Sequence, residues 1–258
     1  FMSTNLQIGI VGLPNVGKST LFNAITKAGA EAANFPFCTI EPNVGVVEVP
    51  DHRIYDLAAM FKPKKTTPAF TRFVDIAGLV AGASKGEGLG NQFLSHIRET
   101  DAIAHVVRCF EDGNITHVEG SIDPVRDMDI INTELCLADL ESVDKKKTKT
   151  AKLAQAGIKQ AKVDLPVLEK VYDALQNGTP ARALTLSEDD LEVLKELNLI
   201  TLKPVLYVLN MAEDDIADPL ANKFVQAASA EAEKEGAKWV PISAEIEEEV
   251  SELDGEEA

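Results

Sequence analysis

Cysteines are few in this chain, and long apolar runs are missing. The 258 residues include three cysteines, at positions 38, 109 and 136, an odd number without the spacing of a metal site. This usage predicts reduced thiols, as in the cytoplasm, rather than a disulfide framework. No run of about 18 apolar residues and no signal peptide occurs, so we expect neither secretion nor a membrane partner.

Basic residues are scarce beside acidic ones. The chain has 25 lysines and arginines against 42 aspartates and glutamates, which gives a formal net charge of −17. Such a charge provides no general attraction to nucleic acid, and we expect no sequence-specific DNA partner. The glutamate-rich stretch 245–257 is typical of a solvated tail or a linker.

Residues 12–19 read Gly-Leu-Pro-Asn-Val-Gly-Lys-Ser and fill every fixed position of the phosphate-binding loop G-x-x-x-x-G-K-[ST]. The apolar run 6–11 before it predicts a buried strand, and Leu21, Phe22 and Ile25 after it have helical spacing. This is the context the motif requires, because backbone N–H groups and the positive end of the helix then meet the phosphates. We therefore assign nucleotide binding to Asn15, Val16, Gly17, Lys18, Ser19 and Thr20.

Side chains of this loop and of a second motif supply the chemistry. Lys18 is expected to reach the β- and γ-phosphates in catalysis, and the Ser19 hydroxyl to ligate Mg²⁺. Asp75 ends a β-like run and opens the D-x-x-G pattern of nucleotide switches. Its carboxylate is expected to hold the Mg²⁺ shell, and the Gly78 N–H to bind the γ-phosphate. Thr39, in a loop that two prolines keep out of helix, is the third candidate metal ligand.

The base-reading motif departs from that of guanine-binding proteins. An apolar strand run ends in Asn210-Met211-Ala-Glu213, where a GTPase carries N-K-x-D. The aspartate of that motif accepts two hydrogen bonds from guanine, and adenine offers neither donor, so Glu213 and the missing lysine at Met211 favour ATP. Asn210 can read the N7 edge of either purine. Backbone N–H groups of Ser243 and Ala244 are expected to contact the base.

The group that activates water is also unusual. Leu79 follows the D-x-x-G motif, where Ras-like enzymes carry a glutamine, and a leucine cannot hydrogen-bond water. We therefore expect slow hydrolysis or a substitute group. His117 lies beyond the carboxyl end of the strand run 102–109, at the sheet edge where ligands bind, so it is a candidate for positioning the water. An ordinary surface histidine is the alternative.

Together these motifs resemble those of the YchF/Obg-like ATPase family. The resemblance rests on the phosphate loop, the segment 34–43, the switch segment 75–80 with the glycine-rich stretch 82–92, and the motif 210–213; it covers essentially the whole chain. It implies a cytosolic ATPase that works with Mg²⁺, uses GTP less well, and associates with ribosomes or translation factors. Family members carry a helical insertion and a C-terminal TGS domain, and we expect this chain to lack the TGS domain.

The order of apolar runs predicts an α/β fold, a GTPase-like P-loop NTPase with a mostly parallel sheet and helices on both faces. Strand runs at 6–11, 69–75, 102–109, 204–210 and 238–243 alternate with helical patterns. The stretch 131–202 breaks this order. It carries helical patterns and a capping-box start at Ser187, so we expect a helical, coiled-coil-like insertion. The nucleotide domain then comprises 1–130 and 203–258.

The predicted insertion carries a set of lysines whose role the sequence leaves open. They either contact ribosomal RNA or form a solvated helix face. The set comprises Lys145, Lys146, Lys147, Lys149, Lys152, Lys159 and Lys162.

Three functions are compatible with these motifs. The first is slow ATP hydrolysis that switches binding to a translation partner. The second is a nucleotide-gated binding module in which hydrolysis is incidental. The third is a GTPase that prefers GTP over ATP.

Overall fold

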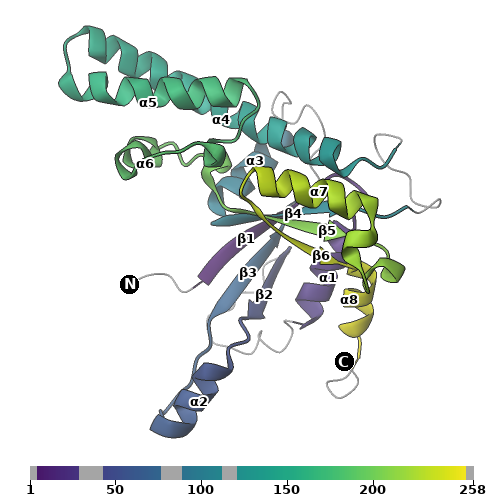
Figure 1. The fold of residues 1–258 in the computed structure, drawn as a ribbon. Helices are drawn as coiled ribbons and strands as arrows, with labels where there is room; N and C mark the ends of the chain where they lie inside the picture. The colour runs from purple at the N-terminus through teal and green to yellow at the C-terminus, as the bar shows by residue number, and fades with distance from the viewer. Residues whose placement is uncertain (1–4, 29–42, 77–88, 112–120, 254–258) are drawn as a thin grey trace.

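Six strands form one sheet in the part of the chain that the structure, a computed structural model, describes: residues 5–28, 43–76, 89–111 and 121–253 (Figure 1). The sheet order is β2-β3-β1-β4-β5-β6, and every pairing except β2 with β3 is parallel. The predicted mostly parallel α/β fold is thus confirmed. The strands are β1 (Asn5–Val11), β2 (Val44–Glu48), β3 (Phe70–Asp75), β4 (Ala102–Arg108), β5 (Val205–Asn210) and β6 (Lys238–Ile242).

Helices cover both faces of the sheet. On one face α1 (Lys18–Ala28) packs against α8 (Ala244–Val250); on the other lie α3 (Leu89–Glu99), α4 (Pro124–Gln155) and α7 (Lys223–Lys234) (Figure 1). Because both faces are covered, the central strands β4 and β5 are buried along most of their length. This explains why their sequences read as continuous apolar runs rather than as alternating ones.

The predicted helical insertion forms an arm. The second half of α4 extends beyond the sheet, α5 (Lys159–Gln176) packs along it, and α6 (Glu188–Lys195) lies below them (Figure 1). Ser187 caps α6 in the predicted capping box, with Asp190 as its partner. The arm has an apolar core of its own, formed by Cys136, Val143, Leu168, Val171, Leu175, Ala181, Leu194 and Leu199. Helix α4 crosses the proposed boundary at residue 131, so the domain division stays a prediction.

Short elements complete the described chain. The 3₁₀ turns η3 (Ala181–Ala183) and η4 (Ile200–Leu202) lead from the arm back to β5, and η5 (Glu213–Asp215) and η6 (Pro219–Ala221) precede α7. Helix α2 (His52–Phe61) extends from the sheet between β2 and β3 (Figure 1). The sequence patterns above name neither β2 nor α2.

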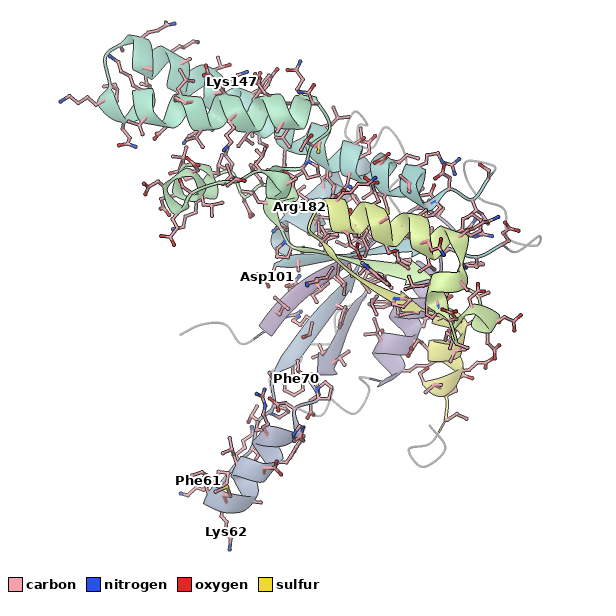
Figure 2. All side chains as sticks on the ribbon, viewed as in Figure 1. Phe61, Lys62, Phe70, Asp101, Lys147 and Arg182 are labelled. Carbon is pink, nitrogen blue, oxygen red and sulfur yellow. The ribbon has the colours of Figure 1, made fainter. Side chains whose placement is uncertain are left out.

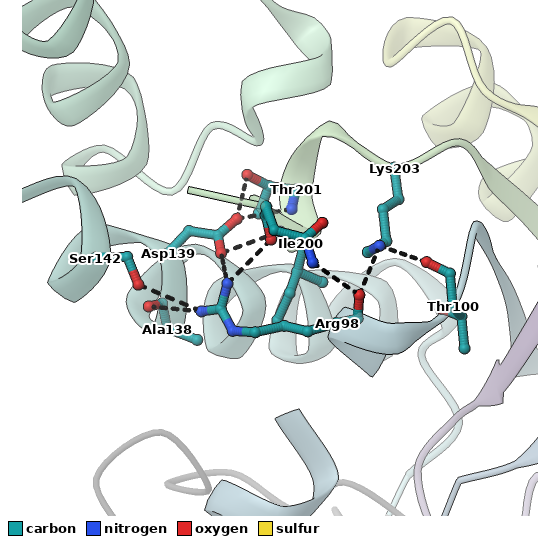
Figure 3. Close-up of polar contacts among 9 residues, drawn as sticks. Arg98, Thr100, Ala138, Asp139, Ser142, Ile200, Thr201 and Lys203 are labelled. Atoms are coloured by element: carbon teal, nitrogen blue, oxygen red, sulfur yellow. Dashed lines mark hydrogen bonds and ion pairs between the residues drawn. The ribbon is translucent and has the colours of Figure 1, made fainter. Parts of the chain in front are cut away.

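The arm is fixed to α3 by a polar cluster (Figure 3). The carboxylate of Asp139, in α4, is completely buried and accepts hydrogen bonds from the backbone N–H groups of Ile200 and Thr201 at 3.1 and 2.7 Å. Arg98, at the end of α3, approaches the same carboxylate to 3.3 Å. The base of the arm is therefore attached to the helix that follows the D-x-x-G segment.

Candidate functional site

The phosphate loop joins β1 to α1 at the carboxyl edge of the sheet. Helix α1 begins at Lys18, and the Leu21 N–H donates to the Gly17 carbonyl at 3.0 Å, which closes the first helical turn. A Cβ on Gly12 would lie 2.8 Å from the Val106 carbonyl oxygen. A Cβ on Gly17, whose φ is +90°, would overlap the side-chain amide of Asn210. Both fixed glycines of the motif are therefore required by sterics, and Gly17 also by its backbone conformation.

Lys18, at the start of α1, meets Asp75, at the end of β3, although the two belong to separate motifs. The Lys18 ammonium forms an ion pair with Asp75 Oδ1, and their side chains are 10% and 20% exposed. Ser19 is exposed beside Lys18, and Thr20 is half-buried. The Ser19 hydroxyl and the Asp75 carboxylate are hard oxygen donors of the kind that Mg²⁺ prefers, so these residues fit the expected metal.

Asn210 connects the phosphate loop to the start of α8. Its side chain is buried; the Nδ2 group donates to the Val16 carbonyl at 2.9 Å, and Oδ1 accepts from the Ala244 N–H at 2.9 Å. The amide has a second N–H, which is the group suited to a purine N7. The Ala244 N–H is engaged by Asn210 rather than directed at a base, and the Ser243 hydroxyl caps α8 through the Ile246 N–H.

A cavity of about 810 Å³ runs along these residues, within the usual size range of ligand pockets. It begins at the phosphate loop and ends at the β5 and β6 strand ends. The lining residues are Asn15, Gly17, Ser19, Thr20, Phe110, Glu111, Asn210, Met211, Ala212, Ala244, Glu245 and Glu248. Glu213 is not among them; it begins the exposed turn η5.

Sequence reasoning missed Arg108, which supports one wall of this cavity. Its side chain is buried; Nε donates to the Phe110 carbonyl at 3.2 Å, Nη1 approaches the Asn15 carbonyl at 3.5 Å, and the guanidinium lies 4.5 Å from the Phe110 ring centroid. An arginine in an otherwise apolar strand run was the available signal. Phe110 and Glu111 were missed too, although they follow that strand at its ligand-binding end.

Comparison with known proteins places this chain in a family. A sequence profile described as 50S ribosome-binding GTPase matches residues 7–133. The ribosome-binding ATPase YchF of Bacillus subtilis (strain 168) is 55% identical over 252 residues, which cover 98% of this chain and 69% of that protein. Its counterpart in Haemophilus influenzae is 56% identical over 251 residues, covering 97% and 68%. The chain belongs to the YchF family.

A solved YchF structure supports the same conclusion. The structure described as the Schizosaccharomyces pombe YchF GTPase superposes with a TM-score of 0.84 at 42% identity, and the match covers all of this chain and 70% of that one. The resemblance inferred from the motifs is thus confirmed, together with the P-loop fold.

Four residues predicted for a YchF-type site fall outside the described residues: Thr39, Gly78, Leu79 and His117. Their roles stay predictions. Within the described ranges, no three His, Cys, Asp or Glu side chains gather as a metal site. This is compatible with Mg²⁺, which commonly takes one or two protein ligands beside phosphate and water oxygens.

Two of the three cysteines can be placed. Cys109 and Cys136 are buried free thiols, and burial raises the pKa of each to about 12, so they stay protonated at neutral pH. Among the described helices, none combines the length and apolar character needed to cross a membrane.

Proposed function

We propose that this chain is a cytoplasmic, Mg²⁺-dependent ATPase. It binds and slowly hydrolyses ATP, uses GTP less well, and changes its association with the ribosome according to the bound nucleotide. The names of its relatives, ribosome-binding ATPases, support the activity and the partner. The observation that carries the proposal is a single cavity that extends from the phosphate loop to Asn210 and Met211.

The phosphate end of the cavity has the groups needed to hold a triphosphate. Backbone N–H groups at the start of α1 and the positive end of that helix attract phosphate oxygens. Lys18 supplies a side-chain cation, which in the structure is neutralised by Asp75. Ser19 and Asp75, with Thr39 as the proposed third ligand, would hold Mg²⁺, which would supply positive charge against the phosphates. Asp75 would then exchange its contact with Lys18 for the metal shell.

The base end of the cavity favours adenine over guanine in our proposal. A guanine-reading aspartate must face the base, whereas Glu213 lies on an exposed turn and does not line the cavity. The apolar Met211 does line it, although most of this side chain is buried in the core. Asn210 offers the same N–H to N7 of either purine, so it does not discriminate between them.

Calorimetric titration of ATP and GTP, each with Mg²⁺, tests the base choice. We expect ATP to bind at least as tightly as GTP. The double variant Met211→Lys with Glu213→Asp restores N-K-x-D and should shift the preference towards GTP by about 1–3 kcal/mol, the value of a bidentate base contact. Asp214→Asn, in the same exposed turn, is the matched control and should not change it. If the unaltered protein binds GTP tenfold more tightly than ATP, the chain is instead a GTPase that prefers GTP. The descriptions of the matching family profile and of the Schizosaccharomyces pombe structure both contain the word GTPase.

The residue that positions water is tested separately. Single-turnover ATP hydrolysis of His117→Ala should fall tenfold or more with ATP affinity preserved if this histidine replaces the missing glutamine. An unchanged rate removes His117 from the mechanism and leaves the surface-histidine interpretation. Leu79→Ala is the companion variant, since Leu79 occupies the glutamine position without a hydrogen-bonding group.

Ribosome binding distinguishes a switch from a simple nucleotide-gated module. A switch predicts different affinity for ribosomes with ATP and with ADP, and ATP turnover that ribosomes stimulate. Equal binding with ADP and with a hydrolysis-resistant ATP analogue would leave the module interpretation in its place.

A further inference from the structure

Helix α2 extends from the sheet and packs little against the rest of the described chain. None of its ten residues is buried, and Met60 and Phe61 are each 74% exposed. Figure 2 shows Phe61 and Lys62 at its far end, away from the sheet. We call residues 60–65 the α2 tip.

The connection between the tip and the sheet is well formed. The Val49 N–H donates to the Ala69 carbonyl at 2.8 Å, which continues the pairing of β2 and β3, and the Tyr55 hydroxyl donates to Glu48 at 2.5 Å. Asp51 caps the start of α2, and Lys62, with φ of +48°, ends it. A helix of this length is marginal in water without tertiary packing. An ordered helix that exposes apolar side chains at its end is typical of a surface that a partner covers.

The charge of the α2 tip identifies the partner's chemistry. Lys62, Lys64 and Lys65 lie within four residues, and none has an ion-pair partner among the described residues, in a chain of net charge −17. The partner must therefore be acidic, and it must also accept an aromatic and a thioether side chain.

Three of the seven arm lysines differ in this respect. Lys145 pairs with Glu141 at 2.5 Å, Lys146 with Glu196 at 2.8 Å, and Lys147 lies 3.0 Å from the Tyr172 ring centroid. The charges of these three lysines are thus compensated locally, whereas Lys149, Lys152, Lys159 and Lys162 have no ion-pair partner among the described residues. The α2 tip differs from those four lysines because its own lysines adjoin an exposed aromatic side chain, that of Phe61.

We propose that the α2 tip binds ribosomal RNA. Its lysines contact phosphates, and Phe61 stacks on an unpaired base, a combination of cations with exposed aromatic rings that is typical of single-stranded RNA recognition. An apolar protein surface would not compensate three desolvated ammonium groups. The inference rests on the proposed association with ribosomes and adds the contact surface.

Co-sedimentation with purified 70S ribosomes tests the lysines. Lys64→Glu with Lys65→Glu should weaken binding at least tenfold. The slope of log affinity against log salt should become shallower by about 0.7–0.9 for each phosphate that the variant no longer neutralises. Lys159→Glu with Lys162→Glu is the matched control on the arm; it makes the same change of charge at exposed positions and should stay within twofold of wild type. ATP turnover without ribosomes should be unchanged in both variants.

A second experiment identifies the partner directly. Phe61→Ala should weaken ribosome binding at least fivefold, and the photocrosslinking variant Phe61→p-benzoylphenylalanine should crosslink to ribosomal RNA. Crosslinking only to ribosomal protein, or wild-type binding by the double lysine variant, would overturn the RNA assignment while the proposed function stands. Failure of the unaltered protein to bind ribosomes with any nucleotide would overturn the proposed ribosome association itself.

Discussion

Arg98 and Asp139 form an ion pair that joins the switch side of the nucleotide site to the arm. The guanidinium lies 3.3 Å from a carboxylate with no exposed surface, and it also donates to the Asn198 carbonyl at 3.1 Å (Figure 3). The backbone of Arg98 is held by the same region: the Asn198 side-chain amide and the Lys203 ammonium both donate to the Arg98 carbonyl, each at 3.1 Å. A movement of α3 would therefore be transmitted to the base of the arm.

Removing Arg98 should destabilise the protein, and more so at neutral pH. Arg98→Leu leaves the buried Asp139 carboxylate without its cation, so we expect a loss of about 3–5 kcal/mol in the free energy of unfolding. Burial already raises the pKa of Asp139, and loss of the arginine raises it further. Protonation then removes the uncompensated charge, so the deficit should shrink as the pH falls through that raised pKa.

Urea unfolding at pH 7.5 and at pH 5 measures the effect. Arg53→Leu is a suitable control, because Arg53 pairs with Asp51 at the surface and its side chain is 78% exposed. Its loss should lower the free energy of unfolding much less than the loss of Arg98 does, at either pH. A deficit for Arg98→Leu that is the same at both pH values would show that Asp139 is not its cause.

Lys18→Ala should abolish triphosphate binding with little effect on the fold. The lysine is the side-chain cation of the phosphate loop, and its loss leaves Asp75 with a side chain that still has 20% of its surface in water. Calorimetry should detect no ATP binding, and thermal unfolding should change little. Lys27→Ala, on the same helix with a surface partner at Glu252, should bind ATP normally. Unchanged turnover in Lys18→Ala would remove this loop from the site.

Local sequence patterns predicted a strand or helix correctly where the burial of that element determines its own pattern of apolar residues. Strands β4 and β5 agree with the predicted runs to within one residue, because both are buried between helices and therefore have nearly continuous apolar sequences. Helix α4 was predicted only in pieces, because the lysine-rich part packs on one side against α5 and lacks a broad apolar stripe. Helix α2 was missed because its apolar residues face no core.

The site shows the same limit. The phosphate loop was predictable because its glycines, lysine and serine occupy fixed positions within the eight consecutive residues 12–19. The bond from Asn210 to Val16 spans 194 positions, and no local pattern encodes it. Arg108 could not be distinguished from a chance charge in a strand until the structure placed it beneath Asn15 and Phe110.

Asn210 should be needed for stability as well as for purine binding. Asn210→Ala leaves the Val16 carbonyl and the Ala244 N–H without their partner, which we expect to cost about 1–3 kcal/mol for each group that becomes buried and unsatisfied. Asn210→Asp keeps the acceptor for Ala244 but loses the donor to Val16. If the bridge holds the loop in shape, both variants should weaken ATP and GTP to similar extents in calorimetry. A selective loss of ATP alone would mean that Asn210 itself discriminates between bases.

Acid stability should depend on His105. This residue lies within β4, its ring centroid 5.3 Å from that of Tyr207, and burial lowers its pKa from 6.5 to about 3, with a further contribution from the charge of Arg182. The folded state therefore keeps the imidazole neutral while the unfolded chain takes up a proton below pH 6.5. Stability from this residue is complete above that pH and falls as the pH drops towards 3, by about 2 kcal/mol between pH 6.5 and 5.

His105→Phe keeps a ring in the core and removes the titrating group. We expect unfolding free energies near those of wild type at pH 7.5 and a shallower loss between pH 6.5 and 5, measured by urea unfolding at closely spaced pH values. His96→Gln, which replaces an exposed histidine of α3, is the control. A His105→Phe profile as steep as that of wild type would assign the acid sensitivity to other groups. The reason to expect otherwise is physical: protonation of His105 would place a second buried cation near Arg182, whose Nη2 already depends on Glu235 at 2.9 Å for its charge partner.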